Sequence, residues 1–225
     1  MRPVLMCDFD NTIVSVDTGI AILSKFADGN WRYYDDLYNR SEMPVEEVLR
    51  RQFSMVRATK SSMIRAIEGS APFRPGFERL LQVCGQRRVS LFVVSYGLDF
   101  CIKHILGKAS QGRNPRIYAP RARVTPNGVR FIFPRRRSKG SVNLKDDLVR
   151  YYKRRGCEVA YVGDGTSDFP AVKNADIRFA IRGSRLADLC DSSGVQFSQI
   201  TSFDPVADKL ESLSVASVNS AKQSQ

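Results

Sequence analysis

The stretch that most constrains the fold is a short apolar run near the start of the chain, residues 4–7, which ends in two aspartates, Asp8 and Asp10. An uninterrupted apolar run of this length is typical of a parallel strand that is buried on both faces. Open α/β sheets bind ligands at the carboxyl ends of their strands, so both aspartates are predicted to face one crevice. Taken alone, an Asp-x-Asp at a strand end can equally cap the following turn.

Further strands alternate with helices along the rest of the chain. Buried strands are predicted at 89–95 and 157–162, shorter strands at 116–124 and 128–133, and two final ones at 177–181 and 195–197. Helices are predicted between them, at 76–87, 98–106 and 144–155. This spacing predicts an α/β fold, a Rossmann-like, doubly wound parallel sheet with helices on both faces.

One long stretch departs from this alternation. Residues 17–72 hold several helical patterns and no convincing strand, so we expect a helical layer inserted after the first strand. The core is then made of residues 1–16 and 73–213. Aromatic side chains of the insert, among them Tyr38, could line its inner face, but packing in its small interior is favoured. Residues 214–225 are rich in Ser, Ala, Asn and Gln and are predicted to form a disordered tail.

The length of 225 residues suits one sizeable core with a small inserted module. No segment approaches the ~18 successive apolar residues of a membrane span, and no signal-peptide pattern is present, so we expect a cytoplasmic protein without a membrane partner. The five cysteines are scattered and lack CxxC spacing, which predicts reduced core residues rather than disulfides or a zinc site. The single histidine, His104, lies in an amphipathic helical pattern, so catalysis by a histidine base is not expected.

The formal net charge of +12 raises nucleic acid or another polyanion as a possible partner. We interpret the cationic residues as spread along the chain, with one dense run at Arg135–Arg137, and no recognisable nucleic-acid-binding module is present. A small anionic metabolite is therefore favoured over nucleic acid as the partner. The oligomeric state, monomer or homodimer, stays open.

Polar side chains stand at the ends of three predicted strands, and a lysine begins the helix before the last of them. Because the carboxyl ends of parallel strands share one edge, these groups are expected to converge. Clustered carboxylates repel one another unless a divalent cation neutralises them, and oxygen ligands suit Mg²⁺. Together with a hydroxyl and an ammonium group, these carboxylates predict a site that binds Mg²⁺ and a phosphoryl group. The residues are Asp8, Asp10, Ser95, Lys145, Asp164 and Asp168.

Two lysines could supply the ammonium group, Lys145 and Lys139. Lys145 begins a helix with Leu148 and Val149 on its buried face, and this helix leads directly into the strand at 157–162. Lys139 lies six residues earlier, in the basic loop. We favour Lys145, because its side chain starts at the active edge of the sheet.

With these residues placed, the chain resembles the haloacid dehalogenase superfamily of phosphotransferases. Residues 8–12, Asp-Phe-Asp-Asn-Thr, match the first motif, DxDx[TV], and Ser95 matches the lone Ser or Thr after a buried strand. Lys145 matches the lysine of the third motif, and residues 163–168, Gly-Asp-Gly-Thr-Ser-Asp, match GDxxxD. Each motif is weak by itself, whereas the ordered set across residues 8–168 is specific.

The resemblance implies a phosphoric monoester hydrolase. It implies that Asp8 is the nucleophile, which forms an aspartyl-phosphate, and that Asp10 is the general acid and base. It further implies Mg²⁺ held by the Asp8 carboxylate, the main-chain carbonyl of Asp10 and Asp164, with Asp168 either a ligand through water or a holder of the other ligands. Ser95 and Lys145 would then stabilise the phosphoryl oxygens.

Residues 17–72 resemble the α-helical cap of one branch, which contains phosphoserine phosphatases and the methionine-salvage phosphatases acting on 2-hydroxy-3-keto-5-methylthiopentenyl 1-phosphate. Asp17 matches an acidic position that contacts substrate in phosphoserine phosphatases, but Gln52 stands where those enzymes carry a carboxylate-binding arginine. Arg50 or Arg51 could substitute for it, but solvated positions on the helix face are favoured for both. Tyr96 and Gly97 follow the serine where two glycines are usual, so both are expected to shape the substrate pocket.

The resemblance therefore implies a small phosphorylated metabolite as substrate, of the methionine-salvage type before the phosphoserine type. The alternative is a basic nucleic-acid-binding protein or a phosphatase acting on polynucleotide ends, which the Arg135–Arg137 run favours.

Overall fold

The computed structural model describes residues 3–109 and 115–222. Its centre is a six-stranded sheet with the strand order β3-β2-β1-β6-β7-β8, and every pairing in it is parallel. The parallel sheet predicted from the strand–helix alternation is confirmed. The strands are β1 (Pro3–Cys7), β2 (Ser90–Val94), β3 (Arg116–Tyr118), β6 (Glu158–Gly163), β7 (Ile177–Ile181) and β8 (Ser198–Ile200).

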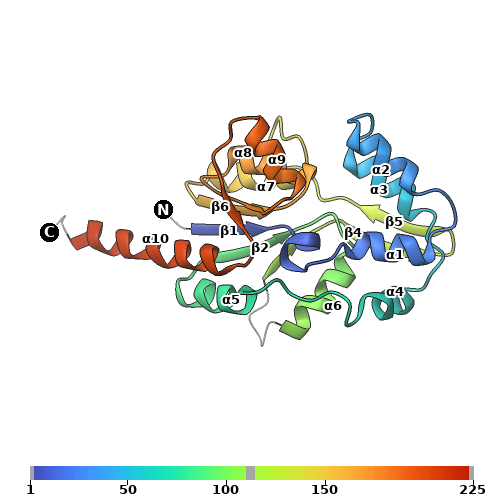
Figure 1. Ribbon diagram of the computed structural model, residues 1–225, viewed down its shortest axis with the longest axis horizontal. Helices are drawn as coiled ribbons and strands as arrows, with labels where there is room; N and C mark the ends of the chain where they lie inside the picture. Colours follow the sequence, from blue (N-terminus) through green and yellow to red (C-terminus); the bar gives the residue numbers. More distant parts are fainter. Residues whose placement is uncertain (1–2, 110–114, 223–225) are drawn as a thin grey trace.

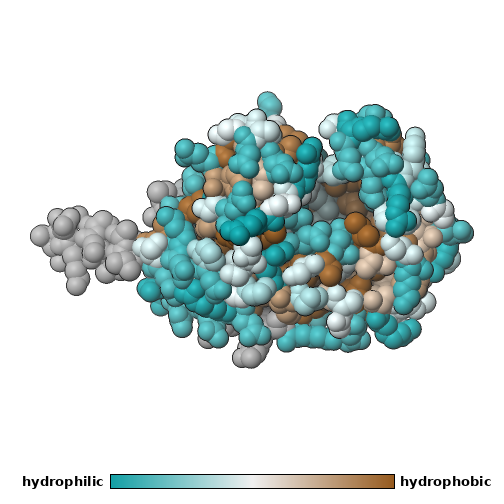
Figure 2. Space-filling view, in the orientation of Figure 1, coloured by the Kyte–Doolittle hydropathy of each residue, from teal (hydrophilic) through white to brown (hydrophobic). Residues whose placement is uncertain are grey.

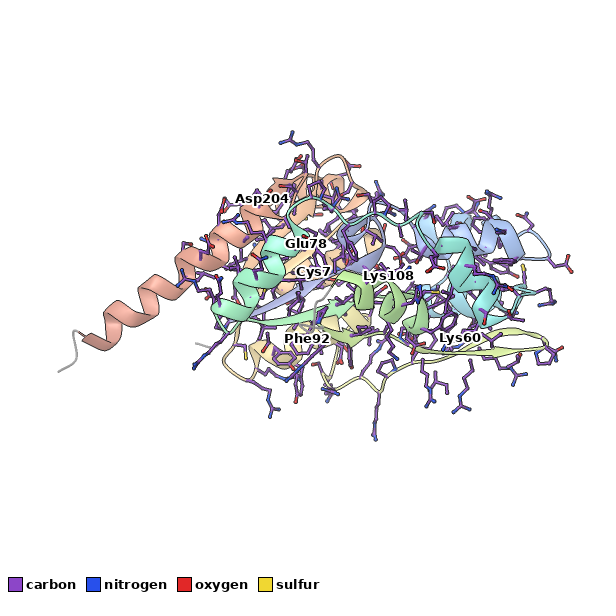
Figure 3. The ribbon with its side chains drawn as sticks, turned by 90° about the horizontal axis from the view of Figure 1, so that it is seen from below. Cys7, Lys60, Glu78, Phe92, Lys108 and Asp204 are labelled. Carbon is purple, nitrogen blue, oxygen red and sulfur yellow. The ribbon has the colours of Figure 1, made fainter. Side chains whose placement is uncertain are left out.

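Strand β1 lies in the middle of the sheet and is buried on both faces, as its uninterrupted apolar sequence predicts. Its alternate side chains enter two different cores: Leu5 and Cys7 pack on one side of the sheet, and Val4 and Met6 on the other. Cys7, labelled in Figure 3, is the last residue of the strand and directly precedes Asp8. All five cysteines are free thiols, and all but Cys157 are buried.

Helices cover both faces of the sheet, which is the predicted doubly wound arrangement (Figure 1). On one face lie α5 (Phe77–Gln86), α6 (Asp99–Ala109) and α10 (Asp204–Lys222). On the other lie α7 (Leu144–Lys153), α8 (Phe169–Asn174) and α9 (Arg185–Ser192). Among the described residues, no helix is both long and apolar enough to cross a membrane.

Four helices fill the stretch between β1 and α5. They are α1 (Thr18–Phe26), α2 (Arg32–Asn39), α3 (Val45–Phe53) and α4 (Lys60–Ile67), and no strand is present among residues 17–72, all of which the structure describes. A hairpin of β4 (Arg121–Thr125) and β5 (Gly128–Ile132) packs against α3, where the rings of Phe53 and Phe131 meet edge-on at 5.3 Å. Helices and hairpin together lie beyond the carboxyl ends of the strands, at the right of Figure 1. That residues 17–72 form a separate cap stays a prediction.

The ends of two strands differ from the sequence-based expectation. The strand predicted at 116–124 is two strands, since Pro120 has no amide hydrogen for a ladder; β3 joins the main sheet and β4 joins the hairpin. The last strand lies at 198–200 and not at 195–197, because Ser198–Ile200 pair with β7 while Val195 and Phe197 pack against the helices of one face.

The last helix extends into the predicted tail. The backbone of α10 is helical to Lys222, and the disorder of residues 214–225 stays a prediction. Residues 206–222 contain neither Gly nor Pro, and Leu210 and Leu213 anchor the preceding turns to the core. A helix that is anchored at one end can therefore continue through this polar sequence. Residues 223–225 lie outside the described residues.

Candidate active site

Strand β1 delivers Asp8 to the carboxyl edge of the sheet. The amide of Asp8 donates to the carbonyl of Val162 in β6 at 2.9 Å, so the ladder continues to this residue. Its Oδ1 accepts a hydrogen bond from the amide of Phe9 at 2.7 Å, which opens the turn Phe9–Ile13. Asp8 is 8% exposed, which leaves its carboxylate accessible from one side only.

Arg74 fixes the turn that follows. Asn11 has a φ of 53°, in the left-handed region that Asn tolerates better than most residues. The Arg74 side chain donates to the carbonyl oxygens of Asn11 at 2.5 Å and of Thr12 at 2.8 Å. A guanidinium group thus satisfies two carbonyls of an irregular turn, and no sequence pattern singled out Arg74 for this role.

Asp10 is held by the start of α1. Its Oδ1 accepts hydrogen bonds from the amide of Thr18 at 2.8 Å and from the Thr18 hydroxyl at 2.6 Å. Burial raises the pKa of Asp10, the nearby charge of Asp17 raises it further, and together they outweigh the Thr18 bonds, so the pKa is about 7. A carboxyl group that titrates near neutrality can both give and accept a proton.

Lys145 joins two of the aspartates. It lies in the first turn of α7, is 1% exposed, and places its Nζ 2.7 Å from Oδ2 of Asp8 and 2.7 Å from Oδ1 of Asp168. Burial alone would lower the pKa of Lys145, but the charges of Asp168 and Asp8 outweigh it and hold the pKa above its usual range. Lys139, the rival lysine, is exposed and does not line the pocket.

Asp168 is completely buried and surrounded by donors. Besides Lys145, the hydroxyl of Tyr161 donates to its Oδ1 at 2.6 Å, and the amides of Asp164 and Gly165 donate to its Oδ2 at 3.3 and 2.9 Å. Gly163 makes room for this carboxylate, because a Cβ at that position would lie 2.5 Å from the Asp168 Cγ. These hydrogen bonds fix the Asp168 carboxylate and, with it, the turn that follows β6.

Asp164 completes the acidic group. Its Oδ1 accepts a hydrogen bond from the hydroxyl of Thr12 at 2.8 Å, and burial together with the charge of Asp168 raises its pKa to about 6. One carboxylate oxygen each from Asp8, Asp164 and Asp168 lies within 4.8 Å of the others. Oxygen donors of this kind and density suit a hard divalent cation such as Mg²⁺.

Ser95 and Gly97 lie beside Asp10. Ser95 follows β2, is 1% exposed, and its Oγ accepts a hydrogen bond from the amide of Gly97 at 2.9 Å. A Cβ on Gly97 would come 2.9 Å from Oδ2 of Asp10, so the chain packs tightly here. The hydroxyl of Tyr96 accepts from the amide of Leu144 at 2.9 Å, which ties this strand end to the start of α7.

A pocket of about 200 Å³ opens over these groups. Figure 2 shows the molecular surface hollowed between the part that carries α8 and α9 and the part that carries α2 and α3. Of the nine residues that the sequence places in the site, the structure brings eight into the pocket lining, and Asp168 lies directly beneath it. The eight are Asp8, Asp10, Asp17, Ser95, Tyr96, Gly97, Lys145 and Asp164.

Helices α1, α2 and α3 supply a mostly apolar wall, formed by Gly19, Tyr38, Val45, Leu49 and Phe53. The favoured expectation for Tyr38 is wrong, because Tyr38 lines the pocket instead of packing in the interior of the helical layer. The sequence of a short helix does not indicate whether an aromatic residue on it packs in the interior or lines a pocket.

Positive charge is scarce in the pocket. Among the described residues that line it, Lys145 is the one lysine or arginine. Gln52 is buried outside the lining and donates hydrogen bonds to Oδ1 of Asp35 at 2.6 Å and to the carbonyl of Trp31 at 3.2 Å. Arg50 and Arg51 pair with Glu47 at 3.6 and 2.7 Å on the surface. None of the three replaces the carboxylate-binding arginine of phosphoserine phosphatases.

The doubly wound sheet, with its acidic pocket at the carboxyl ends of the strands, has the architecture of an α/β enzyme. The chain belongs to the haloacid dehalogenase-like hydrolase family, whose family model matches residues 5–173.

The sequences of curated relatives are about one quarter identical to this chain. The 2-hydroxy-3-keto-5-methylthiopentenyl-1-phosphate phosphatase of Geobacillus thermodenitrificans is 26% identical over 217 residues, which cover 94% of this chain and 97% of that protein. The bifunctional enzyme MtnB/MtnX of Bacillus licheniformis is 27% identical over 93% of this chain, but this chain spans about half (49%) of its length.

Solved structures of phosphoserine phosphatases share the fold. A substrate-bound phosphoserine phosphatase complex superimposes with a TM-score of 0.70 at 18% identity and covers 93% of this chain and 98% of that one. A phospho-aspartyl intermediate analogue of phosphoserine phosphatase gives a TM-score of 0.67 at 20% identity over 92% and 98% of the two chains.

Proposed function

We propose that this protein is a Mg²⁺-dependent phosphatase that hydrolyses a small phosphorylated metabolite through an aspartyl-phosphate on Asp8. The observation that carries the proposal is the single pocket that gathers Asp8, Asp10, Ser95 and Lys145 over a buried acidic centre. The named phosphatases among the curated relatives support the same reaction class.

In the first half-reaction, a carboxylate oxygen of Asp8 attacks the phosphorus and the bond from phosphorus to the alcohol oxygen breaks. Asp10 gives its proton to that leaving oxygen, which its pKa of about 7 permits near neutral pH. The Lys145 ammonium and the Ser95 hydroxyl stabilise the negative charge on the other phosphoryl oxygens.

In the second half-reaction, Asp10 is ionised and accepts a proton from a water molecule. The oxygen of that water attacks the phosphorus, the bond to the Asp8 oxygen breaks, and inorganic phosphate leaves. Thr18 holds Asp10 through two hydrogen bonds during both steps, so the same carboxyl group is positioned first as acid and then as base.

The residues present fit Mg²⁺. Asp8 and Asp164 offer carboxylate oxygens to a common point, and the main-chain carbonyl of Asp10 is the third protein donor that we assign. Asp168 already accepts four hydrogen bonds, which favours its role as a holder of the other groups over direct ligation. Bound there, the cation supplies positive charge that offsets the carboxylates and polarises the phosphoryl group.

The wall of the pocket indicates what kind of alcohol leaves. Val45, Leu49 and Phe53 offer apolar surface, and no cation apart from Lys145 lines the described pocket. A substrate with a carboxylate near its phosphate would lose its hydration there without gaining an ionic partner. We therefore infer a substrate with an uncharged, partly apolar tail, as in the methionine-salvage phosphatases, in preference to phosphoserine. We further infer that residues 17–72 act as a cap over the pocket.

A screen of phosphorylated metabolites with Mg²⁺ tests the proposal. We expect hydrolysis of short phosphoesters with apolar tails, and no hydrolysis of any compound by the Asp8→Asn variant. A wild-type protein that hydrolyses nothing, including a generic aryl phosphate, would refute the proposed activity.

A further inference from the structure

The net positive charge of this protein comes from one segment. Residues 100–145 contain twelve of the 35 Lys and Arg residues and none of the 23 Asp and Glu residues. The rest of the chain holds 23 of each and is formally neutral. The cationic residues are spread along the chain, but the entire net charge of +12 belongs to this segment, because the acidic residues are absent from it.

Four of these cations have acidic partners in the structure. Lys103 pairs with Asp99 at 2.7 Å, Lys108 with Glu68 at 2.5 Å and Arg136 with Glu46 at 3.1 Å, while Lys145 belongs to the active site. Seven others are described and have no ion pair: Arg116, Arg121, Arg123, Arg130, Arg135, Arg137 and Lys139. The twelfth, Arg113, lies outside the described residues.

Three of the unpaired arginines share the outer face of the β4–β5 hairpin. Arg123 lies directly opposite Arg130, and Arg121 lies two residues along on the same face, opposite Ile132. All three are exposed, whereas Val129 and Phe131 point inward and are buried. We call Arg121, Arg123 and Arg130 the arginine face. In Figure 3 the pale yellow hairpin runs along the lower right, where side chains tipped with nitrogen project from the molecule.

This arrangement opposes the stability of the hairpin. Like charges that lie directly opposite each other destabilise a strand pair, and two-stranded ribbons are marginal without packing on one face. The inner face of the hairpin supplies that packing against α3, through the Phe131–Phe53 contact. Folding therefore gains nothing from arginines on the outer face, whereas an anionic partner would neutralise them.

Guanidinium groups outside the hairpin stack on aromatic rings. Arg137 comes five residues after β5 and lies over the rings of Tyr118 and Tyr151, at 5.6 and 5.0 Å from their centres. Arg155 lies over the same Tyr151 ring at 4.8 Å. Stacking on aromatic rings holds guanidinium groups in place, which lowers the cost of binding a phosphate.

We propose that the arginine face binds the phosphate backbone of a nucleic-acid duplex. A two-stranded β-ribbon has the width that the major groove of a duplex admits, and arginine forks suit phosphate oxygens. Contacts of this kind are independent of base sequence and sensitive to salt. The binding surface lies outside the small catalytic pocket, so the duplex is a partner and not a substrate.

A membrane surface is the less favoured partner. Binding to anionic lipid normally combines cationic groups with an apolar face that enters the bilayer. On the outer face of the hairpin the exposed large apolar residue is Ile132 alone, and the apolar side chains of the inner face are covered by α3.

Fluorescence anisotropy with a short blunt-ended DNA duplex, measured over a series of salt concentrations, tests the proposal. The variant carries Arg121→Gln, Arg123→Gln and Arg130→Gln. A matched control carries Arg32→Gln, Arg40→Gln and Arg65→Gln, which remove the same charge from exposed positions on and beside the helices α2 and α4. Circular dichroism shows whether both variants fold, and hydrolysis of a small phosphoester, followed in parallel, should be unchanged in both.

We expect the wild-type protein and the control to bind with similar salt dependence. For the arginine-face variant, the slope of log K against log salt should fall by about 2 to 3, since each phosphate contact contributes about 0.9. Equal loss in variant and control would overturn the proposal, because net charge alone would then explain binding. An absence of duplex binding would also overturn the proposal, whether or not the wild-type protein binds vesicles that contain an anionic lipid. Binding is measured without turnover, so these outcomes do not depend on the proposed phosphatase activity.

Discussion

Thr12 donates a hydrogen bond from its hydroxyl to Oδ1 of Asp164 at 2.8 Å and so links residues that are 152 positions apart in the chain. The turn after β1 and the turn after β6 are thereby fixed to each other. The bond holds one carboxylate oxygen of Asp164 in a set direction, and the same carboxylate is a ligand in the proposed Mg²⁺ site. Partners of this kind set the affinity of a metal site without touching the metal.

Thr12→Val should therefore weaken the binding of Mg²⁺. The concentration of Mg²⁺ that gives half-maximal activity should rise by about 10-fold or more, as is usual when a ligand loses its hydrogen-bonding partner. A titration of activity with Mg²⁺ measures this. The control is Thr125→Val, which removes an equivalent hydroxyl bond to Gly128 in the hairpin. Equal Mg²⁺ requirements in the two variants would contradict the account.

Lys145→Ala should abolish activity, whereas Lys139→Ala should leave kcat and KM close to those of the wild type. Only Lys145 reaches Asp8, at 2.7 Å, while Lys139 is exposed. Removing the ammonium group also leaves Asp8 and Asp168 without their cation, which costs about 3 to 5 kcal/mol for a buried pair. Circular dichroism must therefore accompany the assay. A folded Lys145→Ala protein with normal turnover would rule out the assigned role.

Tyr161→Phe should lower the free energy of unfolding by about 1.5 to 3 kcal/mol, the usual worth of a hydrogen bond to a charged group. The Tyr161 hydroxyl donates to Asp168 at 2.6 Å, and both residues are completely buried. The matched control is Tyr118→Phe, because the buried Tyr118 hydroxyl has no hydrogen-bond partner among the described residues. Urea denaturation compares the two. If Tyr118→Phe destabilised the protein as much as Tyr161→Phe, the importance of the Asp168 network would be refuted.

Leu49→Arg should shift substrate preference toward phosphoesters that carry a carboxylate. Leu49 lines the pocket, where Lys145 is the one cation among the described lining residues, so a new guanidinium group would offer a carboxylate its missing partner. The ratio of kcat/KM for phosphoserine to that for an apolar phosphoester should rise about 10-fold or more, as expected from one charge-assisted hydrogen bond. Ile20→Arg, on the exposed surface of α1, adds the same charge outside the pocket. A ratio that changes equally in both variants would argue against the proposed specificity.

Much of the pocket could be predicted from the sequence because strand ends are visible in it. An apolar run that stops at a polar residue marks the carboxyl end of a parallel strand, and the topology of the fold brings such ends together. This is why the sequence alone indicates Asp8, Ser95 and Asp164. It indicates Lys145 because this residue begins a helix with a buried apolar face that leads into the strand ending at Asp164.

The remaining parts depend on packing between distant segments. Tyr38 enters the pocket because α2 is oriented over the sheet edge, and a short helix does not encode that orientation. Arg74 supports the first turn from a loop that follows the helical insert, 62 residues after Thr12. The hairpin presents its arginines outward because Phe131, on its other face, packs on Phe53. The clustering of charge in residues 100–145, in contrast, is visible in the sequence itself and required only a count.

The central claim is that Asp8 carries the phosphoryl group during turnover. Acid quenching during steady-state hydrolysis, followed by peptide mass spectrometry, tests it directly. The account predicts one phosphoryl group on the peptide that contains Asp8, removed by hydroxylamine as expected for an acyl phosphate, and none in Asp8→Asn. Hydrolysis of the same substrate by Asp8→Asn at a rate near that of the wild type would contradict it.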